Sequence, residues 1–372
     1  MSPHAISRCF ALAPKFLFVS LISMSNIPSM QDIAKRVGVH RSTVSLALRN
    51  SPRVLDSTKQ KVLSVAKELG YVPNPYISVL MRNRRKGKPP PIMPSIALIT
   101  SFPTRDGCVE EFPLVKPAIA AAKRQAESRG FKLEEVWAPL DKMDPARLSN
   151  ILLTRGISGI LLTPFPRPVW NYDIEWKRLA VVSWGMSLRK NRVHHVRSNH
   201  FSGMTMAMDE CWRLGYRRIG LAMREEANTR VDDHWEAAYL LKLRQFGLTD
   251  VPSPLFTKDW SKDVLIDWYR RGSPDVIISY TRKERALQWL RSDGIRIPED
   301  VGMVSLSCAP DGELSGVIEN WSLQAIRGVN LVIDLLADNV LGLHDYPNIS
   351  MVDSTWNPGT TLRPINSEEE VD

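Results

Sequence analysis

The stretch QDIAKRVGVHRSTVSLALRN, residues 31–50, predicts two short helices joined by a turn at Gly38. Apolar residues recur at helical spacing in and just before its first half: Met30, Ile33, Ala34 and Val37. Glycine is a usual residue for such a turn. The stretch therefore predicts a compact pair of helices at this end of the chain.

The second helix has two different sides when successive residues are placed about 100° apart. Val44, Ala47 and Leu48 share the side that we expect to find in a core. The other side carries Arg41, Ser42, Ser45, Leu46 and Arg49. This side either contacts a partner such as DNA or is simply a solvated helix face.

A third helix is predicted to follow, with Asp56 as its N-cap and Gly70 at its end. Its inward residues are expected to be Val62, Val65, Ala66 and Leu69. Three short helices of this kind make a small all-α domain.

The positive charge of the chain is concentrated in this region. Residues 1–95 contain fifteen Lys and Arg against three Asp and Glu, and the remainder contains thirty-four against thirty-seven. A field confined to one end implies an anionic partner there. Hydrophobic residues at 44% and charged residues at 24% exclude a largely disordered chain.

From residue 95 onward, short apolar runs of β type alternate with helical patterns. The runs include SIALIT, GILLTPF, AVVSW, RIGLAM, DVIISY and VGMVSLS. Continuous apolar strands between helices predict doubly wound parallel sheets covered on both faces. About 275 residues of this α/β pattern are expected to form two lobes.

The domain organisation follows from these patterns. We expect residues 1–27 to be an N-terminal extension that is disordered or precedes the true start, although the apolar run after Arg8 also resembles part of a signal peptide. We expect residues 28–73 to be the helical domain, 74–94 a basic, proline-rich linker, 95–366 the two-lobed domain, and 367–372 an acidic tail. The four cysteines lie about a hundred residues apart, which favours a reducing cytoplasm over a disulfide framework.

Two parts of the sequence resemble a known family. MQDIAKRVGVHRSTVSLAL, followed by RNSPRVLDSTKQKVLSVAKELGYVPN, is similar to the DNA-binding headpiece of the LacI/GalR bacterial regulators, and LGYRRIGL and GIRIPEDVGMVSLS resemble motifs of their effector-binding domain. The resemblance implies a helix-turn-helix headpiece joined to a two-lobed, periplasmic-binding-protein-like domain. It implies a transcriptional regulator, most often a repressor, that binds a near-palindromic operator as a homodimer; a tetramer is the alternative.

The resemblance also implies roles for single residues. In a helix-turn-helix the second helix enters the major groove. The family's base-reading positions fall on Arg41, Ser42 and Leu46. Backbone-contacting or supporting positions fall on Ser29, His40, Thr43, Ser45, Arg49 and Asn74. Many relatives carry Arg at the position of Leu46, so their operators are not expected to apply here unchanged.

A hinge helix that inserts an apolar residue into the minor groove is implied after Asn74, with Leu80 as the inserted residue and Ile77 beside it. The basic cluster at residues 82–88 either contacts phosphates or keeps the linker soluble.

The effector-binding positions depart from the family pattern. Several carboxylates that hold sugar hydroxyls in relatives are absent, which argues against an ordinary neutral sugar. The positions that remain as candidates are Phe102, Asn199, Arg230, Trp235, Arg282 and Ser307. Arg282 either pairs with an anionic ligand or is a surface residue, and the aromatic residues either stack on a ligand or belong to the core. Loss of small-molecule control is a further alternative.

No catalytic motif, metal site or cofactor is expected. His194 and His195 are adjacent, so on a strand they would point to opposite faces. The expected partners are double-stranded DNA, a second copy of the chain and an unidentified small molecule, without a membrane. The rival interpretations are a solute-binding protein with the same α/β fold and, third, an enzyme on that fold.

Overall fold

The computed structural model describes residues 30–48, 51–71, 93–170, 172, 174–190, 192–280 and 285–365. The contacts of the chain divide it into two compact units, with the division between Pro73 and Asn74. Among the described residues, no helix has the length and apolarity needed to cross a membrane.

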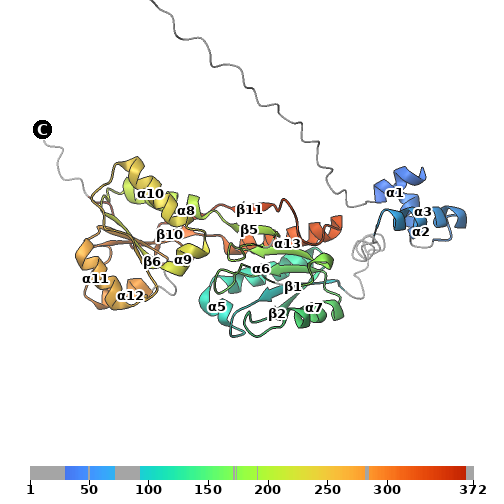
Figure 1. The fold of residues 1–372 in the computed structure, drawn as a ribbon. Coiled ribbons are helices and arrows are strands. Elements are labelled where there is room, and N and C mark those ends of the chain that lie inside the picture. Colours follow the sequence, from blue (N-terminus) through green and yellow to red (C-terminus); the bar gives the residue numbers. More distant parts are fainter. Residues whose placement is uncertain are drawn as a thin grey trace, which may run out of the picture. The chain divides into compact units, whose positions relative to one another are not determined.

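In the first unit, the headpiece, the described residues form three helices (Figure 1): α1 (Met30–Val37), α2 (Arg41–Leu48) and α3 (Asp56–Glu68). Its core consists of Ile33, Ala34, Val44, Ala47, Val54, Val62 and Ala66. The predicted inward sides of the helices are thus confirmed at six of these positions, and the seventh, Val54, precedes α3 and was not predicted. Leu48, Val65 and Leu69 are half-buried and pack against the same core.

One prediction about the headpiece is wrong. The residue that caps α3 is Leu55, whose backbone is extended, and Asp56 is the first residue of the helix itself. Its carboxylate lies 2.8 Å from Nζ of Lys59, one turn ahead. This hydrogen bond holds the pKa of Asp56 below its usual range. Asp56 therefore interacts with a side chain rather than with the free N–H groups of the helix.

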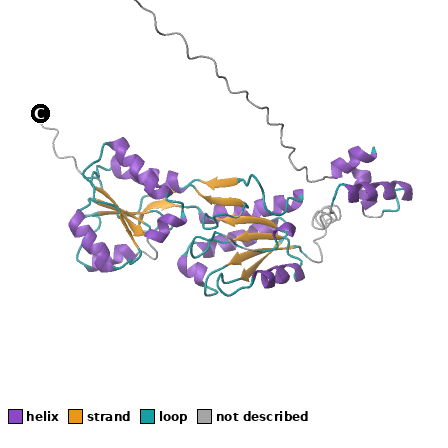
Figure 2. Ribbon diagram, viewed as in Figure 1, coloured by secondary structure: helices purple, strands orange, loops and turns teal. Residues whose placement is uncertain are grey.

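The second unit consists of two lobes, each built on a six-stranded sheet (Figures 1 and 2). The sheet of lobe 1 has the strand order β11-β5-β4-β3-β1-β2, and all its pairings are parallel. The strands are β1 (Ser95–Thr100), β2 (Lys132–Trp137), β3 (Gly159–Leu162), β4 (Ala180–Trp184), β5 (His194–Ser198) and β11 (Ile349–Val352).

The sheet of lobe 2 has the order β12-β10-β9-β8-β6-β7 and is parallel except for the pair of β10 and β12. Its strands are β6 (Ile219–Arg224), β7 (Leu255–Thr257), β8 (Val276–Ser279), β9 (Gly302–Ser305), β10 (Ser315–Ile318) and β12 (Thr355–Asn357). Two doubly wound sheets confirm the predicted fold class.

Helices cover both faces of each sheet because the strands are apolar on both sides. Lobe 1 is covered by α6 (Val115–Ser128) and α13 (Trp321–Asp338) on one face and by α7 (Pro145–Thr154) on the other. Lobe 2 is covered by α8 (His200–Arg213) and α10 (His234–Phe246) on one face and by α11 (Lys262–Gly272) and α12 (Arg285–Ser292) on the other. The short helices α5 (Gly107–Glu111), η1 (Trp176–Arg178) and α9 (Glu225–Arg230) complete the unit.

A glycine brings α13 close to the sheet of lobe 1. A Cβ atom added to Gly328 would lie 2.8 Å from the side chain of Leu161 in β3, which is too close for any real contact. The absence of a side chain at this position therefore lets the helix pack directly on the strand.

The chain passes between the lobes three times, between β5 and α8, between β10 and α13, and between β11 and β12. Side chains link these crossings: Asn199 Nδ2 donates to Asp353 Oδ1 (3.2 Å), and Asn320 Nδ2 donates to the carbonyl of Asp353 (2.9 Å). The hydroxyls of Ser198 and Ser354 lie 3.3 Å apart. The three crossings are therefore connected by hydrogen bonds, and we call them together the lobe hinge, which lies beside the space between the lobes.

Candidate functional site

The helix α2 presents its first turn to solvent. α1 ends at Val37; the next residue, Gly38, has a φ of +74°, and the N–H groups of Gly38 and Val39 both donate to the carbonyl of Ala34. Arg41 and Ser42 follow as exposed residues, whereas Val44 is fully buried. The fold thus holds α2 by one side and leaves the first two residues of the helix accessible.

The other predicted DNA-contacting residues differ in their exposure to solvent. His40 is exposed, and Thr43 and Ser45 are half-buried. Leu46 is half-buried as well and packs against the headpiece core, so it is shared between the core and the accessible side. The predicted residues Ser29, Arg49, Asn74, Ile77, Leu80 and Arg282 lie outside the described residues.

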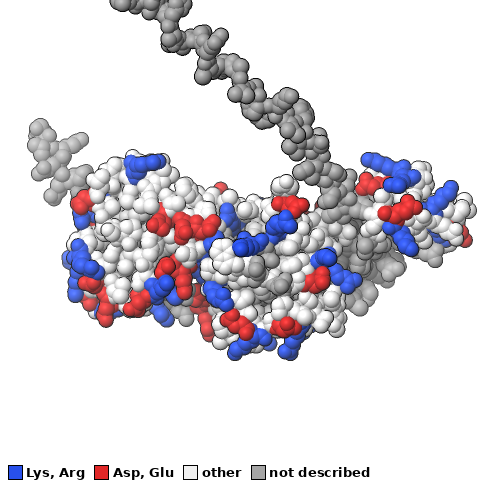
Figure 3. All heavy atoms as spheres, in the orientation of Figure 1, with Lys and Arg blue, Asp and Glu red and all other residues white. Residues whose placement is uncertain are grey.

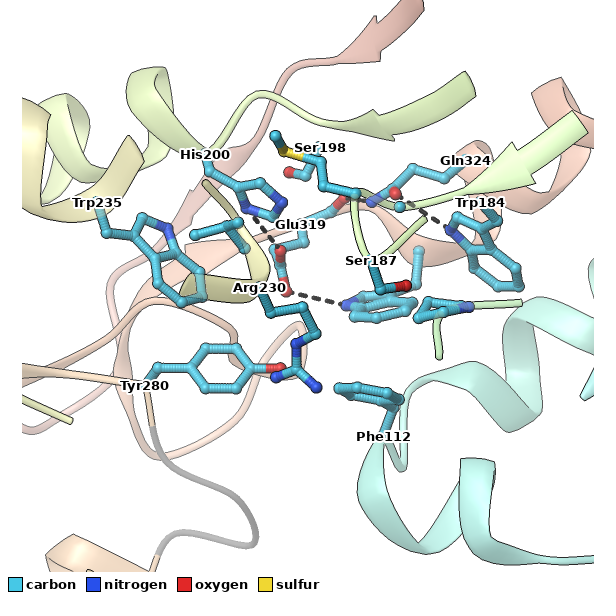
Figure 4. A pocket seen from close by; sticks show the side chains of 15 residues that line it. Phe112, Trp184, Ser187, Ser198, His200, Arg230, Trp235, Tyr280, Glu319 and Gln324 are labelled. Atoms are coloured by element: carbon cyan, nitrogen blue, oxygen red, sulfur yellow. Dashed lines mark hydrogen bonds and ion pairs between the residues drawn. The ribbon is translucent and has the colours of Figure 1, made fainter. Parts of the chain in front are cut away.

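An inner pocket lies between the two lobes, and five of the residues that line it are Phe, Trp or Tyr (Figure 4). Lobe 1 and its helix α13 contribute Phe112, Trp184 and Trp321, and lobe 2 contributes Trp235 and Tyr280. The cavity that remains among them has a volume of only about 40 Å³. That volume accommodates roughly two or three water molecules, and not a sugar or nucleoside.

Arg230 enters this pocket from the last turn of α9 and is only 8% exposed. Its guanidinium lies over the ring of Phe112 (4.8 Å to the centroid) and near that of Tyr280 (5.9 Å), as Figure 4 shows. Nη1 lies 3.7 Å from Oε1 of Glu111 in α5. A guanidinium favours aromatic faces and carboxylates. Arg230 of lobe 2 is therefore held by two residues of lobe 1.

A second arginine connects the lobes at the turn that follows α9. Arg189, whose neighbour Leu188 belongs to the lobe 1 core, lies with Nη1 2.8 Å from Oδ1 of Asp232, and its Nη2 donates to the carbonyl of Thr229. We call the two cross-lobe contacts, Arg230 with Glu111 and Phe112, and Arg189 with Asp232 and Thr229, the clasp.

The turn that follows α9, which carries Asp232 of the clasp, has an unusual backbone. Asp232 and Asp233 both have left-handed conformations, with φ of 61° and 56°. Such residues need support from their surroundings. The buried Asn228 provides it, because its Nδ2 donates to Asp233 (3.1 Å) and to Glu236 (3.0 Å).

Glu319 and His200 form a buried pair at two of the hinge crossings, with Oε1 3.3 Å from Nδ1 (Figure 4). Burial raises the pKa of Glu319 to about 7, against hydrogen bonds from Ser307 and Trp321 that lower it. Burial also lowers the pKa of His200 to about 3. The imidazole is therefore neutral at neutral pH, and the contact is a hydrogen bond of a partly protonated carboxyl rather than a full ion pair.

The predicted effector residues fall in different places. Arg230 and Trp235 line the inner pocket, and Phe102 lines an outer hollow of about 600 Å³ at the mouth of the cleft. Asn199 instead caps α8, accepting from the N–H of Ser202 (3.2 Å), and Ser307 hydrogen-bonds to Glu319.

Sequence reasoning did not single out four polar residues at the cleft: Glu111, His200, Glu319 and Gln324. Glu319 directly follows β10 and Gln324 is the fourth residue of α13, and no local sequence pattern marks either of them as a cleft residue. His194 and His195 do point to opposite sides of β5: His194 packs against His344, and His195 lies 3.2 Å from the carbonyl of Gly185.

The two units each match a protein-family model. Residues 29–74 match the model described as bacterial regulatory proteins, lacI family, and residues 208–339 match the periplasmic binding protein-like domain. The chain belongs to the LacI family. As a member, it is a DNA-binding transcriptional regulator, and the helix-turn-helix distinguishes it from a solute-binding protein that shares only the two-lobed fold.

Relatives of this LacI-family chain are similar over most of their length. The HTH-type transcriptional regulator CelR of Thermobifida fusca is 25% identical over 290 residues, which cover 74% of this chain and 81% of CelR. The HTH-type transcriptional repressor PurR of Haemophilus influenzae is 23% identical over 344 residues, or 87% and 95% of the two chains.

Solved structures have the same fold. The Lac repressor dimer bound to operator and an anti-inducer superposes with a TM-score of 0.56 at 16% identity, covering 90% of this LacI-family chain and 98% of that one. The CelR–cellobiose complex gives a TM-score of 0.54 at 18% identity, covering 90% and 99%.

Proposed function

We propose that this regulator represses transcription by binding a near-palindromic operator as a homodimer, with one headpiece in each half-site. Arg41, Ser42 and Leu46 read base edges, and His40, Thr43 and Ser45 support the helix or contact phosphates. The observation that carries the proposal is the first turn of α2, where Arg41 and Ser42 are exposed while Val44 and Ala47 of the same helix are buried. Side chains near the start of a recognition helix are the ones that reach bases.

The charge of the chain supports the same partner. The excess of Lys and Arg is confined to residues 1–95, whereas the remainder carries a small negative excess. On the face drawn in Figure 3, blue and red residues are interspersed over both lobes. The attraction to DNA phosphates therefore comes from the N-terminal part of the chain.

We further propose that an effector acts by parting the lobes. The inner pocket is filled by aromatic rings and Arg230, and only about 40 Å³ remains. A ligand of metabolite size that enters this inner pocket must displace Arg230 from Phe112 and Glu111, and so release one half of the clasp. An effector that binds the released guanidinium through a carboxylate or phosphate favours the open lobes, because it interacts with one state only.

The test is an equilibrium titration of the purified full chain with a palindromic fragment from beside its own gene. We expect affinity to fall steeply as salt rises, because several phosphates are neutralised on binding. A scrambled fragment of the same length is the control. Equal affinity for both fragments at all salt concentrations contradicts sequence-specific binding.

A further inference from the structure

Two exposed side chains meet at the start of the recognition helix α2. His40 is the last residue before the helix and Ser42 is its second residue. Nδ1 of His40 lies 2.9 Å from Oγ of Ser42 and 3.3 Å from the backbone nitrogen of Ser42. The imidazole therefore occupies the place that a Ser, Asp or Asn side chain takes at most helix starts.

The backbone contact decides where the protons are. A backbone N–H only donates, so Nδ1 of His40 accepts and has no hydrogen of its own. The neutral ring then carries its hydrogen on Nε2. Since Nδ1 accepts, the contact with Ser42 Oγ is made by the serine hydroxyl, which donates its single hydrogen to His40.

This arrangement changes what Ser42 offers to DNA. A free serine hydroxyl both donates and accepts, and for that reason it pairs with any base. In this chain the hydroxyl hydrogen is used by His40, and only the acceptor lone pairs of Oγ remain. In the major groove, adenine N6 and cytosine N4 are donors, whereas guanine and thymine present only acceptors.

We propose that His40 is a positioning residue that makes Ser42 an acceptor, so that Ser42 selects adenine or cytosine over guanine or thymine at the base it faces. The inference rests on the proposed function, because it assumes that the first turn of α2 reads bases. It assigns a specificity role to a residue that does not itself touch the base.

The experiment is a set of parallel selections of bound sites from random DNA with the full chain. The base facing Ser42 is identified as the half-site position whose preference is lost in Ser42→Ala. Wild type is expected to select adenine or cytosine there. His40→Ala is expected to reduce that preference about two- to tenfold, the value of one hydrogen bond, while the rest of the half-site is unchanged.

Two further variants separate positioning from structure. His40→Asn supplies an acceptor oxygen at the same capping place and is expected to retain the preference. Ser64→Ala, which removes an exposed hydroxyl bonded to Glu68 in α3, is expected to change no base preference. If His40 only capped the helix, His40→Ala would lower the melting temperature and the affinity for all sites alike, with the same selected bases.

The outcomes distinguish the two proposals. If wild type enriches no sequence, the proposed function fails and this inference with it. If wild type enriches a half-site but Ser42→Ala alters none of its positions, only the inference about His40 is overturned. The same holds if guanine or thymine is selected at the position facing Ser42, or if His40→Ala keeps the full preference.

Discussion

Arg41 is the first residue of α2, and its exposed guanidinium is free of the headpiece core. Arginine bonds guanine through both O6 and N7, an interaction worth about 1–3 kcal/mol of discrimination. We expect Arg41→Ala to lose guanine preference at one position of each half-site, as measured by titration against single-base operator variants. Arg41→Lys keeps the charge but not the bidentate geometry, so it should keep most of the affinity for DNA and lose the preference for guanine. Unchanged base preference in both variants would remove Arg41 from the reading residues.

Glu319 gives a pH-dependent prediction. Its ordinary pKa of 4.5 is raised to about 7 in the folded protein, chiefly by burial. The fold therefore prefers the protonated carboxyl, and this contribution is full below pH 4.5 and is lost as the pH rises through about 7. The loss amounts to roughly 3 kcal/mol at most.

Replacement of Glu319 by Gln removes this titration while keeping an oxygen that accepts from Trp321. We expect the melting temperature of Glu319→Gln, measured by calorimetry, to rise relative to that of wild type as the pH is increased from 5 to 8. Glu313→Gln, at a half-exposed glutamate paired with Arg291, is the control and should show no such trend. A constant difference between Glu319→Gln and wild type over this range contradicts the assignment.

At the scale of elements, the turn after α9 controls how the lobes meet. Arg189 is 12% exposed at its side chain and bonds both Asp232 and the carbonyl of Thr229. Its loss removes both of these contacts between the lobes, of which Asp232 is exposed and the carbonyl belongs to the half-buried Thr229. We expect Arg189→Ala to shift the lobes toward an open arrangement and to increase the radius of gyration in small-angle X-ray scattering.

The control for this prediction is Arg271→Ala, which removes an arginine paired within α11 with Asp267, one turn away. It should leave the scattering curve unchanged. Scattering curves that coincide for Arg189→Ala and wild type would mean that the clasp does not hold the lobes.

The elements were predictable from sequence where strands are continuously apolar. β1, β3, β4, β6, β8 and β9 were all expected, and they are buried on both faces. The strands without such a signal were not expected. β2 lies at a sheet edge and carries Lys and Glu, β5 consists of His, Val, Arg and Ser, and the short strands β7, β10 and β12 each contain Ser, Thr or Asn among their three or four residues. These strands form because they pair with neighbouring strands of the sheet, and not because of a local hydrophobic pattern.

The accessible start of α2 and the cleft between the lobes also differ in how far the sequence predicts them. The exposed side of α2 follows from helical periodicity in eight residues, so Arg41 and Ser42 were predictable from sequence. The contact of Glu111 with Arg230 joins residues 119 positions apart in different lobes, and it depends on three chain crossings that no local pattern specifies. The bond between His40 and Ser42 depends on side-chain rotamers, which periodicity does not give.

At the scale of the whole molecule, function divides between the two units of the chain. The headpiece supplies three helices, a small core and the accessible start of α2, while the two-lobed unit supplies a cleft that is closed by its own side chains. The residues proposed to read bases lie in the first of these units. We therefore expect the headpiece to provide sequence-specific binding and the lobes to modulate it.

The most direct measurement is sequencing of the DNA that the wild-type full chain retains from a random library. We expect enrichment of an inverted repeat with two equivalent half-sites, each containing one position that depends on Arg41. Recovery of DNA whose sequence composition is the same as that of the starting library contradicts it.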